Sequence, residues 1–493
     1  MIEIRHFNEA HVQIVCEFDE AQEIADLFSF YSPNYNWSPK YQSGIWDGKI
    51  RLFNVNNCLL PYGLLKKFLG YCKLNEWEYK IKFDDYDRLM ESGDKVSTSE
   101  ILEFCKELKC ELIPRDYQIK AVQYFMYHRK MIGVSATASG KSFIYYILFN
   151  LLKYIYPDFK GLLIVPRTSL VEQMAGDFQD YAKNLCDFQK YVHRIYAGRE
   201  KYTDKSITIS TWQSLKNMPP EYFEPFHAVV VDEVHEATAK ELPRITNHCV
   251  NAAYRVGMTG HLKDCKIAKM QLTALLGNVK TFSSSADLIK KGILADIQIK
   301  GIVLKYRDHI IKQFSGKLKK DYNAETEIIR NIPERKRFLC KLAASRKGNT
   351  MVLFKIREYG RELERLLKKN FPKKHIYYID GTVSVKYREQ VRKVAEKHEG
   401  IIIVASYGTF STGINIKNLH NLIFAESVLS SIKVIQSIGR VLRKCFEKNA
   451  KLYDITDDLC WKSKRNYVLK HFLRRIEYYD REQFEYDVTN KGI

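Results

Sequence analysis

Residues 136–142, Ala-Thr-Ala-Ser-Gly-Lys-Ser, have the residue types of a phosphate-binding loop. An apolar run precedes them and the helical pattern of Phe143–Leu152 follows, which is the strand, loop and helix order that such a loop requires. Backbone N–H groups at the helix N-terminus would hold phosphate oxygens, Lys141 would neutralise the β and γ phosphates, and Ser142 would ligate Mg²⁺. Ser135 stands where the first glycine of the motif is expected, so the run alone also fits a chance turn. The nucleotide-binding candidates in this run are Thr137, Ala138, Ser139, Gly140, Lys141 and Ser142.

A pair of carboxylates follows an apolar run about ninety residues later. Val229–Val231 predicts a buried strand, and Asp232 and Glu233 come directly after it. At the carboxyl edge of a parallel sheet, Asp232 can hold Mg²⁺ through water and Glu233 can polarise an attacking water. Acidic pairs at strand ends also cap helices, so the pair alone does not indicate catalysis. Its occurrence together with the phosphate-binding loop favours the catalytic interpretation. Together the two patterns predict nucleotide hydrolysis.

Two arginines three residues apart, Arg440 and Arg443, fall on one face of a predicted helix that also carries Gln436. Such a pair can reach a γ-phosphate across a cleft and stabilise the charge that develops during phosphoryl transfer. Supplying it from a second domain makes hydrolysis depend on domain closure. The alternative is a solvated basic helix face, which is the commoner role of such a pair taken singly.

The elements that must position these residues read as parallel α/β units from residue 113 to about 480. Short β-branched runs alternate there with helical patterns, which predicts two doubly wound sheets. We expect domains at 113–297 and 298–493, preceded by a small α+β domain at 1–112. The expected strands of the first sheet are Met131–Ser135, Leu162–Val165, Ile207–Ser210, Ala228–Val231 and Arg255–Met258, and those of the second are Met351–Phe354, Ile376–Ile379, Ile401–Ala405, Asn421–Ala425 and Lys451–Asp454.

The charge of the chain favours a polyanionic partner. Lys and Arg outnumber Asp and Glu by 79 to 58, and residues 300–493 alone hold 42 basic and 22 acidic side chains. Residues 1–112 are net acidic, but 37–83 hold eight basic and three acidic residues, so this stretch could hold the duplex arms of a junction. The aromatic residues there fit either a nucleic-acid surface or a core. They are Trp37, Tyr41, Trp46, Phe53, Tyr62, Phe68 and Tyr71.

The C-terminal region predicts a basic amphipathic helix over about 461–476, with an apolar face of Val468, Phe472 and Ile476 and a free basic face. No membrane span is expected, because the longest apolar stretch is about ten residues and a span needs about 20. The first residues lack a signal pattern, and the eleven cysteines form no C-x-x-C pair. We therefore expect a cytoplasmic protein with reduced thiols and no membrane partner.

Taken in order, these patterns resemble the motifs of superfamily 2 helicases of the DExH type, whose motor has two RecA-like domains. Arg115–Gln118 resembles the adenine-reading motif, and Asp232, Glu233 and His235 match the motif that names the type. The other segments that carry the resemblance are Gly140–Ser142, Val165–Leu170, Ser210–Ser214, Thr259–His261, Phe354, Gly381 with Arg388, Ser411–Asn415 and Gln436–Arg443.

The resemblance implies ATP and Mg²⁺ as cofactors and a role for each matching residue. It implies adenine contacts by Arg115 and Gln118, and metal ligation by Ser142 and Asp232. It implies a catalytic set of Lys141, Asp232, Glu233, Gln436, Arg440 and Arg443. The implied DNA contacts are Arg167, Thr168, Thr211, Trp212, Gly381, Arg388, Thr412 and Gly413.

Within this superfamily the chain resembles the UvsW family of recombination helicases of T4-type phages. The resemblance lies in Gly44–Leu52, Leu60–Leu64, Val404–Gly413 and Gly439–Lys444. It implies 3′→5′ translocation by a monomer in the bacterial host cytoplasm, acting on single-stranded and branched DNA and on RNA–DNA hybrids. The implied reactions are Holliday-junction branch migration, fork regression and removal of D- and R-loops in recombination, repair and replication. The chain departs from the motifs at Ser135 and at His261, where a small residue is usual.

Three other functions remain open at this point. An RNA helicase is the nearest, because a motor that holds the backbone need not distinguish the sugar. A translocating restriction subunit is disfavoured, because no further carboxylate cluster suggests a nuclease. An ATP-independent strand-annealing protein is disfavoured by the intact Lys141, Asp232, Glu233, Arg440 and Arg443.

Overall fold

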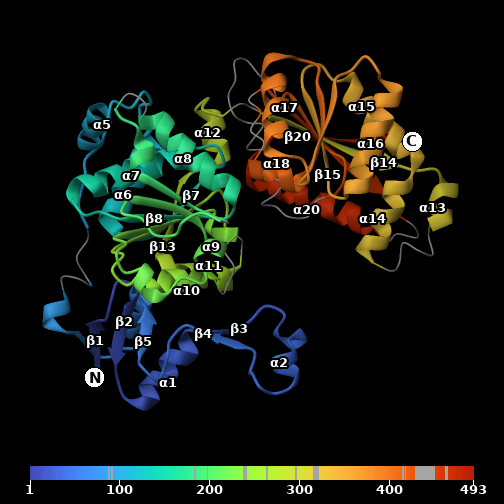
Figure 1. The fold of residues 1–493 in the computed structure, drawn as a ribbon. Helices are drawn as coiled ribbons and strands as arrows, with labels where there is room; N and C mark the ends of the chain where they lie inside the picture. Colours follow the sequence, from blue (N-terminus) through green and yellow to red (C-terminus); the bar gives the residue numbers. More distant parts are fainter. Residues whose placement is uncertain are drawn as a thin grey trace. The chain divides into compact units, whose positions relative to one another are not determined.

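The computed structural model describes residues 1–493 except 87–88, 90–92, 183–184, 197, 237–240, 263–264, 295–296, 315–320, 414–415, 417, 428–449 and 461–464, and only the backbone of 313–314, 385 and 411–413 (Figure 1). The described chain divides into two compact units. The first comprises Met1–Ser135 and Gly140–Phe282, and the second comprises Ala136–Ser139 and Ser283–Ile493. Each unit contains one seven-stranded sheet.

The sheet of the first unit has the order β13-β7-β12-β11-β8-β10-β9, and the five strands expected from the sequence lie in it side by side. Their registers are parallel. The sequence pattern missed the two edge strands, β9 and β13, because they are short or largely exposed and show no continuous apolar run. The strands are β7 (Lys130–Ser135), β8 (Gly161–Val165), β9 (Val192–Ile195), β10 (Ile207–Thr211), β11 (Ala228–Asp232), β12 (Tyr254–Thr259) and β13 (Asn278–Ser283).

Alternate residues of these strands enter two separate cores, because successive side chains of a strand point to opposite faces. Leu163 and Val165 of β8 belong to the core that also contains α6, α7 and α8, whereas Leu162 and Ile164 pack with α9 and α10. Helix α7 is apolar on every side and buried from Phe143 to Leu152, as a core helix must be. The helices are α5 (Thr98–Glu107), α6 (Asp116–His128), α7 (Lys141–Ile155), α8 (Thr168–Ala182), α9 (Trp212–Leu215), α10 (Glu241–His248) and α11 (Lys266–Leu276).

The sheet of the second unit has the order β16-β17-β15-β18-β19-β14-β20 and is also parallel. Its strands are β14 (Ile297–Lys305), β15 (Thr350–Phe354), β16 (Ile376–Ile379), β17 (Ile402–Ser406), β18 (Asn421–Phe424), β19 (Ala450–Asp458) and β20 (Tyr486–Gly492). Its helices are α12 (Ser285–Lys290), α13 (Asp308–Phe314), α14 (Tyr322–Asn331), α15 (Pro333–Ser345), α16 (Arg357–Asn370), α17 (Val385–Lys397), α18 (Tyr407–Gly413) and α20 (Tyr467–Arg481). Two parallel sheets with a small α+β region before them confirm the expected fold class. Among the helices described, none has the length and apolar character needed to cross a membrane.

The expected C-terminal helix forms as α20, but its basic side chains are not all free. Val468 and Phe472 are buried as predicted. Arg475 is also fully buried, because its guanidinium donates two 2.8 Å hydrogen bonds to the carboxylate of Asp454 on β19. The expectation of a wholly free basic face is therefore wrong at Arg475. Burial of such a pair depends on good geometry, and removing either partner leaves a buried charge.

The N-terminal region of the first unit contains a four-stranded sheet of order β5-β2-β1-β6. This region contacts the first parallel sheet through Glu9. The Glu9 carboxylate lies 2.6 Å from Nζ of Lys130, and the backbone N–H of Glu9 donates to the carbonyl of Val250 at 2.9 Å. Gly63 approaches α11 so closely that a Cβ there would lie 1.8 Å from the carbonyl oxygen of Thr273. The elements are β1 (Ile2–His6), β2 (His11–Val15), α1 (Phe18–Leu27), β5 (Leu59–Pro61), α3 (Leu65–Leu74) and β6 (Tyr79–Ile81), with a separate pair, β3 (Ser29–Tyr31) and β4 (Lys49–Arg51).

Candidate nucleotide-binding and DNA-contacting sites

The loop between β7 and α7 contains two residues with a left-handed backbone. Ala138 and Gly140 have φ values of +66° and +82°, in the left-handed region. Helix α7 then begins at Lys141 with Gly140 as its N-cap and no capping side chain, so its N-terminal backbone carries the partial positive charge that attracts anions. A Cβ on Gly140 would lie 2.6 Å from Nε2 of Gln118, so a larger residue would displace that amide.

Lys141 lies against the carboxylate pair. Its Nζ is 3.0 Å from Oε1 of Glu233, and both side chains are largely buried. Burial acts to raise the pKa of Glu233, but the charges of Lys141 and His235 outweigh it and hold that pKa below its usual value. Glu233 also has a left-handed backbone with φ of +46°, a conformation that is strained for a non-glycine residue. Strain of this kind at the end of a buried strand is typical of functional sites.

Asp232 ends β11 and is buried, with a hydrogen bond to a tyrosine that the sequence analysis did not single out. The hydroxyl of Tyr145 donates to Oδ1 of Asp232 at 2.7 Å. Burial, followed by the charge of Glu233, raises the pKa of Asp232 to about 6. Tyr145 lies four residues after Lys141, on the same face of α7, and that spacing was the signal that could have identified it.

A threonine joins the rest of this site. Thr259 lies at the end of β12. Its hydroxyl oxygen is 2.5 Å from Nδ1 of His235 and 3.4 Å from Oε2 of Glu233. The N–H of His261 donates to Oγ1 of Thr259 at 3.3 Å. The backbone N–H and carbonyl of His261 are thus both hydrogen-bonded to Thr259.

Ser142 and the two adenine-contact candidates also lie at this loop. The hydroxyl of Ser142 is 2.8 Å from that of Tyr181 at the end of α8, a contact for which the sequence gave no signal. The side chain of Gln118 is buried, accepts from the N–H of Arg115 at 2.9 Å and donates to the carbonyl of Gly140 at 3.4 Å. The structure thus brings Gln118 to the phosphate-loop glycine, and Arg115 is linked to that glycine through its hydrogen bond to Gln118.

The DNA-contact candidates of the first unit differ in accessibility. Arg167 is partly exposed and pairs with Glu236 at 3.4 Å, and Thr168 is the first residue of α8. Thr211 is buried and caps α9 by accepting from the N–H of Ser214 at 3.4 Å. Trp212 is only 5% exposed and packs in the core with α10. The side chains of Thr211 and Trp212 are therefore not accessible to DNA, whereas that of Gln213 in α9 is exposed.

The candidates of the second unit are described only in part. Gly381 follows β16 in open space, where a Cβ would meet nothing within 4 Å. The guanidinium of Arg388 in α17 donates two hydrogen bonds to the carbonyl of Val383, at 3.0 and 2.8 Å, and so holds the preceding loop. Thr412 and Gly413 lie in α18, where only their backbone is described. Gln436, Arg440 and Arg443 lie outside the described residues.

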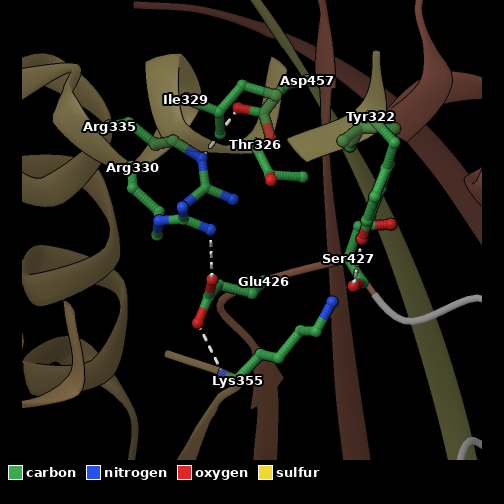
Figure 2. Close-up of a pocket in the computed structure, with 10 residues that line it drawn as sticks. Tyr322, Thr326, Ile329, Arg330, Arg335, Lys355, Glu426, Ser427 and Asp457 are labelled. Carbon is green, nitrogen blue, oxygen red and sulfur yellow. Dashed lines mark hydrogen bonds and ion pairs between the residues drawn. The ribbon is translucent and has the colours of Figure 1, made fainter. Parts of the chain in front are cut away.

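Figure 2 shows a polar pocket in the second unit, just before the segment that contains those arginines. Glu426 organises it: Oε2 accepts from the backbone N–H of Lys355 and of Ile356, and Oε1 lies 3.3 Å from Arg330. Oδ1 of Asp457 accepts from Nε of Arg335 at 2.8 Å. The pocket therefore ties the start of α16 to the end of β18 and is lined by charges that largely neutralise one another.

The groups around Lys141 have the donor set that a magnesium nucleoside triphosphate requires. A helix N-terminus and an ammonium suit phosphate oxygens, and a hydroxyl and a carboxylate suit a hard divalent cation. Lys141, Ser142, Asp232 and Glu233 supply these groups within one unit. The fit extends to Gln118, whose side-chain amide reaches the same loop.

Two RecA-like sheets and a lysine–carboxylate site at the end of β11 define a motor of the helicase class. Family models agree: "Type III restriction enzyme, res subunit" matches residues 111–264, "Helicase conserved C-terminal domain" matches 334–445, and "DNA helicase UvsW, N-terminal" matches 1–84. The chain is 34% identical to the ATP-dependent DNA helicase UvsW of Enterobacteria phage T4 over 98% of both chains. It belongs to the UvsW helicase family, which confirms the expected resemblance.

Two further comparisons agree with this assignment. The crystal structure of T4 UvsW covers 100% of this chain and 99% of its own, with 32% identity and a TM-score of 0.52. A protein of Sulfurisphaera tokodaii named DNA 3′-5′ translocase XPB2 is 23% identical and covers 71% of this chain and 82% of its own. The similarity to that protein is more distant.

Proposed function

We propose that this chain is an ATP-driven DNA helicase that translocates 3′→5′ and remodels branched DNA. The observation that carries the proposal is the contact of Lys141 with Glu233 beside the buried Asp232, at the N-terminus of α7. The T4 relative is named an ATP-dependent DNA helicase, which supports the activity, and the S. tokodaii relative is named a 3′-5′ translocase, which supports the polarity.

In this proposal the phosphate-binding loop, the start of α7 and the carboxylate pair bind Mg²⁺–ATP. Lys141 leaves Glu233 and neutralises the β and γ phosphates, and Ser142 and Asp232 hold the metal, directly or through water. Glu233, released from the ammonium, orients and polarises the attacking water. Gln118 and Arg115 hold the base, and Thr137, Ala138, Ser139 and Gly140 supply backbone N–H groups. The metal, when bound, neutralises charge between the phosphates.

We also propose the domain arrangement 1–112, 113–297 and 298–493, with the arginines of the last domain completing catalysis. Arg440 and Arg443, with Gln436, would stabilise charge on the transferred phosphoryl group only when the two motor domains close. Alternating closure and opening would move a strand held by backbone contacts from both domains. The proposed contacts are Arg167, Thr168, Gly381, Arg388, Thr412, Gly413 and the backbone at Thr211 and Trp212.

The proposed substrates are Holliday junctions, stalled forks, D-loops and R-loops, with the chain acting as a monomer in the host cytoplasm. Phosphate contacts carry no base information, so the action is expected to be independent of sequence. The +21 charge supports a nucleic-acid partner and predicts binding that weakens as salt rises.

The decisive experiment is dissociation of a synthetic four-way junction with and without ATP, alongside ATPase assays with single-stranded DNA, duplex DNA and RNA. We expect ATP-dependent dissociation and DNA-stimulated turnover, both lost in Lys141→Ala. Partial duplexes with a single 3′ or 5′ overhang test the polarity. Stimulation by RNA alone would assign the chain as an RNA helicase, and annealing without ATP turnover would leave only a strand-annealing function.

A further inference from the structure

A small lobe stands apart from the main sheet of the N-terminal region. We define the β3–β4 lobe as residues 29–51, in which β3 and β4 pair antiparallel and the chain between them forms the short helices η1 (Tyr35–Trp37) and α2 (Pro39–Gln42). These two strands form a sheet of their own and are not hydrogen-bonded to the four-stranded sheet. Figure 1 shows the lobe as a separate projection beyond α1.

Contacts between aromatic rings order the lobe, although Tyr31 and Tyr41 remain exposed. The ring of Tyr35 stacks on Tyr31 with centroids 4.6 Å apart and meets the ring of Tyr41 edge-on at 4.8 Å. Gly48 has φ of +80°, and a Cβ there would lie 2.5 Å from the ring of Tyr35. Nε1 of Trp46 donates to the carbonyl of Lys49 at 2.9 Å, which fixes the return strand. The lobe is therefore pre-organised, so a ligand would bind it at little entropic cost.

The lobe also carries large apolar side chains for which no such ring contact is found among the described residues. Trp37 is 81% exposed and Ile45 is 78% exposed. Burial of an indole or of a branched aliphatic chain would stabilise the fold, yet neither side chain is buried. Both side chains are therefore accessible to a ligand.

The charge around Trp37 indicates what binds. The lobe contains the basic residues Lys40, Lys49 and Arg51 and a single acid, Asp47, which pairs with Arg51. Residues 1–112 as a whole are net acidic, with 13 basic and 19 acidic side chains, so the lobe is a local basic surface. Nζ of Lys49 lies 4.0 Å from the carboxylate of the exposed Asp26, a surface pair that a phosphate can replace. An exposed aromatic ring on a lobe that also carries ammonium groups suits nucleic acid, in which a base stacks on the ring and the ammonium groups contact phosphates.

We propose that the β3–β4 lobe binds the branch point of DNA, with the Trp37 indole stacked on a base exposed where strands part and Lys40 and Lys49 on the flanking phosphates. Bases inside an intact duplex present no free face, and unstacking them costs a few kcal/mol, so a single indole selects positions where stacking is already interrupted. This deepens the proposed function, on which it rests, by naming the group that recognises branched substrates.

Binding is tested without ATP on a four-way junction whose arms are closed by non-nucleotide linkers, against a linear duplex closed by the same linkers, which offers no unpaired base and no branch point. Trp37→Ala should weaken junction binding about 5- to 100-fold, as expected for loss of one base–aromatic stack, and should leave binding to the linear duplex unchanged. Trp37→Phe should recover most of the affinity. Phe83→Ala is the matched control, because Phe83 is an aromatic residue of the same N-terminal region that is 92% exposed, and it should bind like the unaltered chain.

A second readout reports the stack itself. 2-Aminopurine placed at the branch point should change its fluorescence on binding the unaltered chain or Trp37→Phe, and should not change with Trp37→Ala. Equal junction affinity of Trp37→Ala and the unaltered chain would overturn the proposal, and loss of a protein partner from that variant alone would assign the lobe to a protein instead. Single-strand-stimulated ATPase activity of Trp37→Ala should be normal. Failure of that activity in the unaltered chain would count against the helicase function and not against the lobe.

Discussion

The hydroxyl of Tyr145 donates a 2.7 Å hydrogen bond to Oδ1 of Asp232, and both side chains are buried. Tyr145 belongs to α7, whose first residue, Lys141, contacts Glu233. One helix therefore positions groups against both members of the carboxylate pair. The relative placement of the phosphate-binding loop and the carboxylates depends on the rigidity of that buried helix.

Removal of the Tyr145 hydroxyl should weaken Mg²⁺ use more than it weakens folding. Tyr145→Phe leaves Oδ1 of Asp232 without its donor, so the carboxylate is less well oriented, and groups that orient a metal ligand are commonly worth about 10- to 100-fold in metal affinity. We expect the Mg²⁺ concentration for half-maximal ATPase activity to rise in that range. Tyr146→Phe is the control, because the buried Tyr146 hydroxyl has no hydrogen-bond partner among the described residues. An equal shift in both variants would refute the role of Tyr145.

Loss of the phosphate-loop ammonium should abolish turnover. Lys141→Ala removes the charge that faces Glu233, and removing one group that stabilises transition-state charge typically costs about 100- to 1,000-fold in kcat. Steady-state ATPase assays with saturating single-stranded DNA measure the effect. Lys153→Ala, on the same helix but with its ammonium over the ring of Tyr191, should retain activity. Substantial turnover by Lys141→Ala would contradict the assignment of this site.

Acid should destabilise the first unit through His11. Burial, the larger cause, and the charge of Arg255, the smaller, lower the pKa of His11 on β2 to about 4. The ordinary pKa of a histidine is 6.5. The unfolded chain therefore binds a proton that the folded chain excludes, so stability is retained above pH 6.5 and is lost as the pH falls toward 4. The loss between pH 7.5 and pH 5 should be on the order of 1–2 kcal/mol. Urea unfolding at both pH values should show a smaller loss in His11→Leu, whereas His309→Leu, at an exposed position, should behave like the unaltered chain.

The buried pair of Arg475 and Asp454 should dominate the stability of the second unit. Arg475→Ala leaves the Asp454 carboxylate buried with only neutral partners such as the Tyr479 hydroxyl, which typically costs about 3–5 kcal/mol. Thermal unfolding monitored by circular dichroism should show a lower Tm for this variant. Arg474→Ala, the exposed neighbour on α20, should change the Tm by little. Equal effects of the two substitutions would show that the pair is not decisive.

The parallel sheets were predictable because their central strands are buried on both faces and read as continuous apolar runs, as in Val229–Val231. The edge strand β20 was not, since every residue of Tyr486–Gly492 is exposed and its pattern carries no burial signal. The phosphate-binding loop and the carboxylate pair were predictable from residue types and spacing. The contact between Ser142 and Tyr181 was not, because it joins residues 39 positions apart that only the packing of α8 brings together.

The N-terminal aromatic residues show the same limit. The sequence left them open between core and surface, and the structure divides them: Phe53 and Phe68 are buried, whereas Trp37 and Tyr41 are exposed. Alternation alone cannot separate these outcomes, because β4 is only three residues long and pairs outside the main sheet. The choice depends on contacts made across the fold.

The close approach of Gly63 to the backbone of Thr273 leaves no room for the N-terminal region to slide over α11. Together with the contact of Glu9 to Lys130, this close packing fixes the N-terminal region against the nucleotide-binding sheet. A DNA arm bound by the N-terminal region would therefore move together with that sheet whenever the sheet rotates. Even an alanine at residue 63 would clash with this backbone and push the two regions apart. Movement of the sheet would then be transmitted less completely to the DNA arm.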